Sequence, residues 1–343
     1  MAEVRRDIVN DTWVIVQTDS SSAERQGANA WLGRPAIRNS ESCPFCEGHE
    51  ALTPPETFSI RTSGTTPNAP GWQVRVVPSH QPILRIEGEL KRSGVGIHDM
   101  VTGIGANEVI VETPEHGASL SELTDGQISL VLISYRQRIA DLYRDQRLRY
   151  VMVFKKLDRR ADSSGVVHSH SELIALPATP RRIKDELNGA RHYYEYKERC
   201  IFCDIIQNEL DARKRVLLET GRFLVYVPYA GRFPFELTVI PKGHGHAYEN
   251  AADDELADLG SVMKRTLTAL RVALEGPACD YALHTAPNLL PKRGYWQTIR
   301  DDFHWHIEII PRIGAFEGFE RESGLHINPV APERAAEILR EKL

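Results

Sequence analysis

The chain has 343 residues, of which 41% are hydrophobic and 26% charged, and its formal net charge is −5 at pH 7. This length allows two ordinary domains or one large one, and the absence of a basic excess argues against a nucleic-acid partner. No apolar stretch is long enough to span a bilayer, and the N-terminus lacks the apolar core of a secretion signal. We therefore expect a cytoplasmic globular protein that binds neither nucleic acid nor membranes.

Hydrophobic spacing in the first half of the chain predicts a long helix followed by a buried strand. Apolar residues recur at helical intervals over residues 128–142. Thr124, followed three residues later by Gln127, fits a capping box at the start of this helix. The apolar run over residues 150–155 then predicts a strand.

The second half shows the same alternation of strands and one long helix. Residues 223–227 and 237–240 predict strands, and apolar positions over residues 256–274 predict the helix. Strands around a single long helix, twice over, favour the α+β class, with antiparallel sheets and flanking helices.

Cysteine and histidine landmarks occur twice in the same order. Each half contains a Cys-x-x-Cys pair, then a histidine after a proline, then a His-x-His-x-Glu run. The two sets are Cys43-Pro44-Phe45-Cys46, Pro114-Glu115-His116 and His168-Ser169-His170-Ser171-Glu172, then Cys200-Ile201-Phe202-Cys203, Pro241-Lys242-Gly243-His244 and His304-Trp305-His306-Ile307-Glu308. Chance rarely orders six such landmarks in this way, so we interpret the chain as a duplicated unit. The polar stretch 187–199 marks the boundary and predicts domains over 1–190 and 191–343.

Each half also offers the donors of a zinc site. Two cysteines separated by two residues chelate one metal from a tight turn, and zinc takes two further nitrogen or sulfur ligands. The histidines available for this are His116 and His168 in the first half and His244 and His304 in the second. A closed Cys₂His₂ site is structural and contributes to folding. Spacing alone leaves open buried free thiols, and iron in place of zinc, including at the second site. We interpret Cys279 as a core residue.

The first His-x-His-x-Glu run has the alternation of a strand, in which residues two apart share a face. His168, His170 and Glu172 then project together. A neutral imidazole is a competent nucleophile toward an activated phosphate, because its pKa lies at about 6.5, and attack gives a covalent nucleotidyl-histidine. The preceding loop, residues 159–165, has cations, hydroxyls and a glycine suited to phosphate oxygens. On spacing alone, a metal site or a structural pair explains the run at least as well.

With these motifs together, the chain resembles the galactose-1-phosphate uridylyltransferases and their sugar-nucleotide phosphorylase relatives, in the histidine-triad superfamily. The resemblance covers nearly the whole chain and independently accounts for the duplication. Its markers are residues 5–7 with 13–14, then 42–46, 73–78, 108–116, 233–236, 303–308 and 324–329.

The resemblance implies different roles for the two histidines of the first run. The middle histidine, His170, is the nucleophile, and Glu172 lies beside it as the second catalytic position. The first zinc site is implied at Cys43, Cys46, His116 and His168.

For the second metal site, the resemblance implies two versions. Relatives with a second Cys pair combine it with the two later histidines, which are here Cys200, Cys203, His244 and His304. Other members use a glutamate and three histidines, which are here Glu186, His284, His304 and His306. Because the second Cys pair is present in this chain, we favour the Cys₂His₂ version with zinc.

The resemblance also implies substrate contacts and an assembly. The sugar-binding segment corresponds to residues 318–320, although Phe319 and Glu320 are equally well explained as the end of a sheet. Nucleotide and phosphate contacts are expected at Arg75, Ser79, Lys156, Ser164 and Gly165. Known members are homodimers whose active sites borrow residues from the neighbouring subunit, with nucleotide sugars and sugar phosphates as substrates.

Glu172 departs from the family motif, which ends in glutamine. The amide would donate a hydrogen bond to the transferred phosphoryl group, whereas an ionised carboxylate would repel it. Three resolutions stay open: Glu172 is protonated, it turns toward Arg159, Arg160 or Lys156, or it acts as a general base for water or another acceptor. The chain departs from the family at four further positions. It has Lys156 where the family has asparagine, Gly165 where it has serine, Ser79 where it has asparagine and Asn107 where it has histidine. The scaffold is kept while the nucleotide and phosphate contacts change.

The sequence therefore predicts a nucleotidyltransferase that acts on a nucleotide sugar and a sugar 1-phosphate through a covalent nucleotidyl-histidine. One alternative is a phosphorylase or hydrolase whose acceptor is altered by Glu172. The other is a zinc-stabilised nucleotide-binding protein without catalysis, against which the retention of His170 argues. His306 repeats the position of His170, and a second metal site or core packing explains it better than chemistry.

Overall fold

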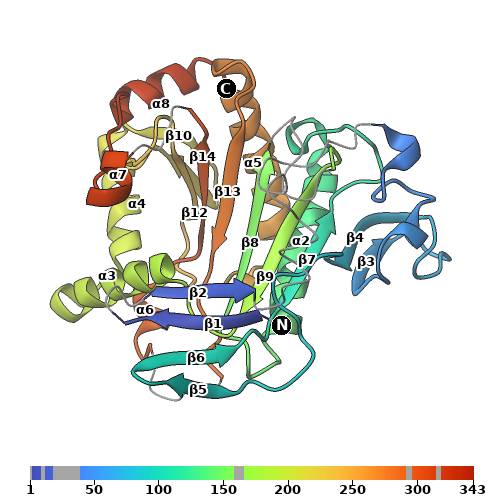
Figure 1. The fold of residues 1–343 in the computed structure, drawn as a ribbon. Helices are drawn as coiled ribbons and strands as arrows, with labels where there is room; N and C mark the ends of the chain where they lie inside the picture. Colours follow the sequence, from blue (N-terminus) through green and yellow to red (C-terminus); the bar gives the residue numbers. More distant parts are fainter. Residues whose placement is uncertain (1, 9–11, 18–38, 158–165, 291–295, 314–317) are drawn as a thin grey trace.

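The computed structural model describes residues 2–8, 12–17, 39–157, 166–290, 296–313 and 318–343. Its centre is a ten-stranded antiparallel sheet to which both halves of the chain contribute (Figure 1). In spatial order the strands are β10 (Val216–Glu219), β11 (Phe223–Tyr226), β12 (Leu237–Pro241), β14 (His306–Pro311), β13 (Cys279–His284), β8 (Tyr150–Leu157), β9 (His170–Leu176), β7 (Ala106–Val111), β4 (Trp72–Pro78) and β3 (Phe58–Arg61).

The sheet consists of two five-stranded halves that meet where β8 pairs with β13. From this seam outward the order is β8-β9-β7-β4-β3 on one side and β13-β14-β12-β11-β10 on the other. In both halves the innermost strand follows the long helix, and the strand that begins within the His-x-His run lies next to it. The predicted α+β class with duplicated histidine-triad-like units is confirmed. The two domains predicted over residues 1–190 and 191–343 share this one sheet, and the division between them stays a prediction.

Two long helices cover one face of the sheet and enclose the main core with it. They are α2 (Asp125–Leu142) and α5 (Asp253–Ala273), and α8 (Pro332–Arg340) adds Ala335, Ala336 and Leu339 to the same core. Gly260 lets α2 and α5 approach closely, because a Cβ there would lie 2.6 Å from Ser129 Oγ. The long-helix side of the sheet is mainly apolar, apart from the polar network under β9 described below and the buried ion pair between Glu108 of β7 and Arg138 of α2.

The opposite face of the sheet carries the shorter elements. These are α3 (Arg181–Lys197), α4 (Ile201–Ala212), α6 (Ile299–Asp302) and α7 (Gly318–Ser323). Short 3-10 turns lie in connecting segments at Ser40–Ser42, Glu50–Leu52, Leu120–Glu122 and Tyr248–Asn250, and the last two pack against the long helices. A separate four-stranded sheet has the order β2 (Thr12–Gln17), β1 (Ala2–Asp7), β6 (His98–Thr102) and β5 (Arg92–Val95). Within the described ranges, no helix has the length and apolar character needed to cross a membrane.

The predicted start of the first long helix is confirmed in part. Thr124 is the N-cap of α2, and its side chain accepts a hydrogen bond of 3.1 Å from Gln127 N. The side chain of Gln127 does not complete the capping box. It donates instead to Gln73 O at 2.8 Å and to Glu112 O at 2.7 Å, and so connects the helix to the sheet. The strands predicted at 150–155, 223–227 and 237–240 and the helix at 256–274 are all present.

Candidate functional site

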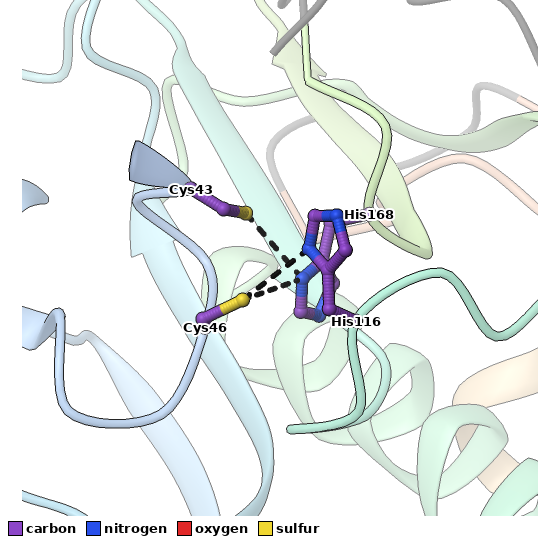
Figure 2. A group of neighbouring side chains, drawn as sticks. All are labelled: Cys43, Cys46, His116 and His168. Atoms are coloured by element: carbon purple, nitrogen blue, oxygen red, sulfur yellow. Dashed lines mark hydrogen bonds between the residues drawn. The ribbon is translucent and has the colours of Figure 1, made fainter. Parts of the chain in front are cut away.

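The structure brings the four predicted ligands of the first zinc site together (Figure 2). Cys43 and Cys46 come from the turn after the 3-10 helix Ser40–Ser42, His116 from the loop after β7, and His168 from the residues just before β9. His168 Nδ1 lies 3.5 Å from Cys43 Sγ and 3.7 Å from Cys46 Sγ, and His116 Nδ1 lies 3.3 Å from Cys46 Sγ. Zinc bonds of about 2.3 Å to sulfur and about 2.1 Å to nitrogen place these atoms about 3.6 Å apart in a tetrahedron. The donor set therefore fits zinc.

Hydrogen bonds orient His168 for this role. Its Nε2 lies 2.8 Å from Thr113 O, and because a carbonyl only accepts, Nε2 carries the proton and Nδ1 offers its lone pair to the metal. Burial lowers the pKa of His168 to about 4, so the imidazole is neutral. Burial and the neighbouring Cys43 raise the pKa of Cys46 to about 12, and a bound cation would favour the thiolate of Cys46.

The second Cys pair forms an equivalent group. Cys203 Sγ lies 3.5 Å from His244 Nδ1 and 3.8 Å from His304 Nδ1, and Cys200 Sγ lies 4.0 Å from His304 Nδ1. His304 Nε2 donates to Gly243 O at 2.8 Å, as His168 Nε2 does to a carbonyl in the first unit. His304 therefore faces the cysteines and not the glutamate of the alternative version of the site.

The residues of that alternative version form a third group nearby. Glu186 of α3, His284 and His306 bring their donor atoms within 4.8 Å of one another. Glu186 Oε2 lies 2.8 Å from His284 Nδ1, and Glu186 Oε1 lies 3.2 Å from His306 Nε2. Glu308 Oε2 approaches His284 Nε2 at 3.5 Å. Two imidazoles and a carboxylate could hold a further metal ion.

His170 presents its second nitrogen away from the backbone. Its Nδ1 lies 2.6 Å from His168 O, so Nδ1 carries the proton and Nε2 bears the lone pair that a nucleophile needs. The two histidines of the run thus use opposite nitrogens. The ring of Phe45, from the Cys-x-x-Cys turn, lies edge-on to His170 with the centroids 5.3 Å apart. Phe202 lies beside His306 in the second half, with the ring centroids 5.4 Å apart and the ring planes inclined by 33°.

A buried charge network lies beneath His170, on the face toward the long helices. Lys155 Nζ is 2.6 Å from Glu112 Oε2, and the two side chains are 3% and 0% exposed. Ser169 Oγ donates to Glu112 Oε2 at 2.6 Å, and Ser171 Oγ donates to Glu112 Oε1. Tyr135 OH bonds to Ser171 Oγ, to Glu112 Oε1 at 3.3 Å and to the hydroxyl of Tyr281 at 2.7 Å. Burial alone would raise the pKa of Glu112, but Lys155 and the serine hydroxyls outweigh it and lower the pKa.

Two further predicted residues share a sheet face with His170. Glu172 follows His170 by two positions on β9, so the two side chains share a face. Phe154 of β8 pairs with Glu172, and Lys156 lies two positions after Phe154, so Lys156 is on this face as well. Both Glu172 and Lys156 are half-buried. Their contact with a substrate stays a prediction. Ser164 and Gly165, together with Arg159 and Arg160, lie outside the described residues.

The other predicted substrate contacts lie in different surroundings. Arg75 is 1% exposed, and its guanidinium bonds to Glu56 Oε2 at 3.0 Å and to Thr53 Oγ1 at 2.8 Å. Ser79 follows β4 and donates its backbone N–H to an adjacent strand. Phe319, which is 57% exposed, and Glu320 belong to α7, which Figure 1 places beside α4 and away from β9.

Sequence reasoning missed the residues that surround the two histidine runs. Phe45 and Phe202 carried a signal, since each is the third residue of its Cys-x-x-Cys motif. Lys155 carried a weaker one, as a cation within a predicted buried strand. Glu112 carried none that identified its partner, because the partner lies 43 positions away in the chain.

The chain is similar to known nucleotide-sugar enzymes along nearly its whole length. No model of a protein family matches the chain. An ADP-glucose phosphorylase of Arabidopsis thaliana is 31% identical over 348 residues, covering 99% of this chain and 92% of the relative. A galactose-1-phosphate uridylyltransferase of Thermotoga maritima is 27% identical over 348 residues, covering 99% and 98%.

Solved structures agree with these relatives. The crystal structure of an ADP-glucose phosphorylase from Arabidopsis thaliana with bound ADP-glucose has a TM-score of 0.74 and 29% identity, covering 99% of both chains. A uridylyltransferase structure has a TM-score of 0.78, covering 99% of this chain and 98% of the other, and at 24% identity it supports the fold alone.

Proposed function

Because the chain belongs to the family of galactose-1-phosphate uridylyltransferases and ADP-glucose phosphorylases, we propose that it transfers a nucleotidyl group from a nucleotide sugar through a covalent intermediate on His170. The orientation of His170 carries this proposal. Its Nδ1 proton is held by His168 O at 2.6 Å, which leaves the Nε2 lone pair for attack on phosphorus.

The chemistry then proceeds in two displacements. The Nε2 lone pair attacks the phosphorus of the nucleotidyl group, a P–N bond forms, and the P–O bond to the sugar 1-phosphate breaks and releases it. An acceptor oxygen next attacks the same phosphorus, the P–N bond breaks, and the imidazole returns to its neutral form. The carbonyl of His168 favours the first step, because it stabilises the positive charge that develops on the ring as the P–N bond forms.

Zinc at the first Cys₂His₂ group would be held by Cys43, Cys46, His116 and His168, and its contribution would be structural. His168 links this group to the nucleophile, because its ring faces the cysteines while its carbonyl holds His170. We propose a second zinc at Cys200, Cys203, His244 and His304. We further propose a cytoplasmic homodimer, in which the exposed Phe319 of α7 reaches the active site of the neighbouring subunit together with Glu320.

The acceptor distinguishes two candidate activities. Sugar 1-phosphate gives a uridylyltransferase-like exchange, and orthophosphate gives a phosphorylase. The phosphorylase is supported by the 31% identity to an ADP-glucose phosphorylase, and the exchange by the 27% identity to a galactose-1-phosphate uridylyltransferase, each over nearly the full length of both chains. Glu172, in place of an amide, bears on the same choice. ADP-glucose and UDP-glucose are therefore the first two donors to test.

The test is to trap the intermediate. Intact-protein mass spectrometry after incubation with ADP-glucose or UDP-glucose should show one nucleotidyl adduct per chain, which tandem spectra place on His170. His170→Gln should form none, and the matched variant His306→Gln should still form it. A chase with orthophosphate, galactose 1-phosphate or water identifies the acceptor. An adduct that persists in His170→Gln would refute the nucleophile.

A further inference from the structure

The ion pair beneath His170 is an unusual feature for a sheet core. Glu112 and Lys155 come from β7's end and β8, and both are buried on the side of the sheet that α2 and α5 cover. Removing two charges from water is costly, and replacing a buried pair by apolar residues often leaves a protein as stable or more so. A buried pair is therefore not explained by folding alone.

The second unit shows what the same positions look like without the pair. Continuing the β8–β9 register by one residue places Lys155 opposite Ser171. The equivalent pair in the second unit is Leu283 of β13 opposite Ile307 of β14, and both of these residues are apolar. The residues that flank His306 are Trp305 and Ile307, which are 2% and 1% exposed, where serines flank His170. Continuing the β12–β14 register by two residues places Pro241 at the position of Glu112. The fold builds this layer from apolar residues where no histidine is proposed to react.

The network holds the backbone of the His170 strand at two points. Lys155 Nζ donates to His170 O at 2.8 Å, and Glu112 N donates to Ser169 O at 3.1 Å. The hydroxyls on both sides of His170 bond to the same carboxylate. The Nδ1–His168 O bond then fixes the ring relative to this immobilised backbone. Nε2 is left with one direction in which to reach phosphorus.

We propose that Glu112 and Lys155 are a positioning pair that fixes the backbone of His170 for nucleotidyl transfer. This inference rests on the function proposed above. The pair touches no substrate, and it acts through the carbonyl of His170 and the serines beside it. Misplacement of a reacting group by about 1 Å costs on the order of 100-fold in rate, so loss of the pair should slow formation of the adduct by about that factor.

The decisive variant is the double substitution Glu112→Gln/Lys155→Met, which removes both charges while keeping the length of both side chains. Under single-turnover conditions at saturating ADP-glucose or UDP-glucose, whichever labels the wild type, we expect adduct formation to slow about 100-fold. The donor concentration for half-maximal rate should stay within about threefold of wild type, because a misplaced nucleophile weakens the transition state and not ground-state binding. The single variants leave one buried charge unpaired, and they should be slow and less stable.

Glu108→Gln/Arg138→Met is the matched control. It removes another buried ion pair between the same sheet and α2, with Arg138 Nη2 2.7 Å from Glu108 Oε1. This control should lower the melting temperature and leave the rate of adduct formation within about threefold of wild type. A Glu112/Lys155 double variant that forms the adduct at the wild-type rate would overturn the proposal, because it would show that each charge only compensates the other and does not position His170. Equal slowing by the control pair would overturn it as well.

Nuclear magnetic resonance of ¹⁵N-labelled histidine separates this inference from the proposed function. Wild type and the control should show His170 as the single tautomer protonated at Nδ1, and the double variant should show a mixture of tautomers. An unchanged tautomer in the double variant would refute the positioning role whether or not any nucleotide sugar reacts. A wild type that shows the ordered tautomer and forms no adduct would instead refute the proposed function.

Discussion

The two halves of the molecule hold the middle histidine of each run in the same way and then treat its second nitrogen differently. His170 Nδ1 bonds to His168 O at 2.6 Å, and His306 Nδ1 bonds to His304 O at 3.1 Å. In the second half, Nε2 of His306 lies 3.2 Å from Glu186 Oε1, so a carboxylate occupies the direction from which a phosphate would approach. Like charges repel strongly in a buried site. The backbone of the run thus orients an imidazole, and the surroundings decide whether it can react.

The largest difference between the two halves is expected when one metal ligand is removed from each. Cys43→Ser should remove the metal at the first group and slow adduct formation about 100-fold, because His168 is both its ligand and the support of His170. Cys200→Ser should remove the metal at the second group and lower the melting temperature. The folded fraction should still form the adduct within about threefold of the wild-type rate.

Metal analysis by mass spectrometry, together with single-turnover rates on the same samples, checks this prediction. Equal rate losses in the two variants would show that both groups support His170. Metal that persists after both Cys pairs are disabled would place an ion at the third group, Glu186, His284 and His306.

The sequence made the ligand groups predictable because their donor types and order repeat. It also made the long helices and several strands predictable, since their apolar periodicity is strong. It did not reveal which nitrogen each histidine presents, because that depends on carbonyls of other segments, such as Thr113 O for His168. The neighbour of His306 was named only by the resemblance, as a ligand of the alternative metal site, because Glu186 belongs to a helix 120 positions earlier than the residue it contacts.

Arg75 shows a different limit of sequence reasoning. The family motif marks it as a candidate substrate contact, and the residue type suits a phosphate. In the structure its guanidinium is buried against Glu56, whose own ion pair with Arg61 completes the cluster. A motif identifies which residue is retained, whereas the partner that reaches it from a distant segment determines what the residue contacts.

The glutamates at the ends of the two runs give a second way to sharpen the comparison. Glu308 is 16% exposed and bonds to Arg182 and to Arg232, the latter at 3.0 Å. Burial raises its pKa, but His284 and the two arginines outweigh this and lower the pKa from 4.5 to about 2. A folded-state pKa below the unfolded value stabilises the protein above about pH 4.5, and this stabilisation is lost as the pH falls toward 2.

Glu308→Gln should therefore cost about 3 kcal/mol of unfolding free energy at pH 7, at about 1.4 kcal/mol per unit of pKa shift. Urea unfolding at pH 7, 4 and 3 measures it, and the gap between variant and wild type should narrow as the pH falls. A gap that stays constant with pH would mean that the charge of Glu308 is not what stabilises the fold.

The smallest effect is expected at Glu172, the counterpart of Glu308 in the first run. A carboxylate on the same face as His170 repels an incoming phosphate, and a half-buried position reduces that repulsion to about 1.4 kcal/mol. Glu172→Gln should accordingly raise the single-turnover rate of adduct formation about tenfold, with little change in stability. The chase of the adduct by galactose 1-phosphate, orthophosphate and water shows whether the acceptor changes too. If Glu172 instead activates the acceptor as a general base, the variant will form its adduct no faster and release it more slowly, and the two glutamates will then differ in chemistry as well as in charge partners.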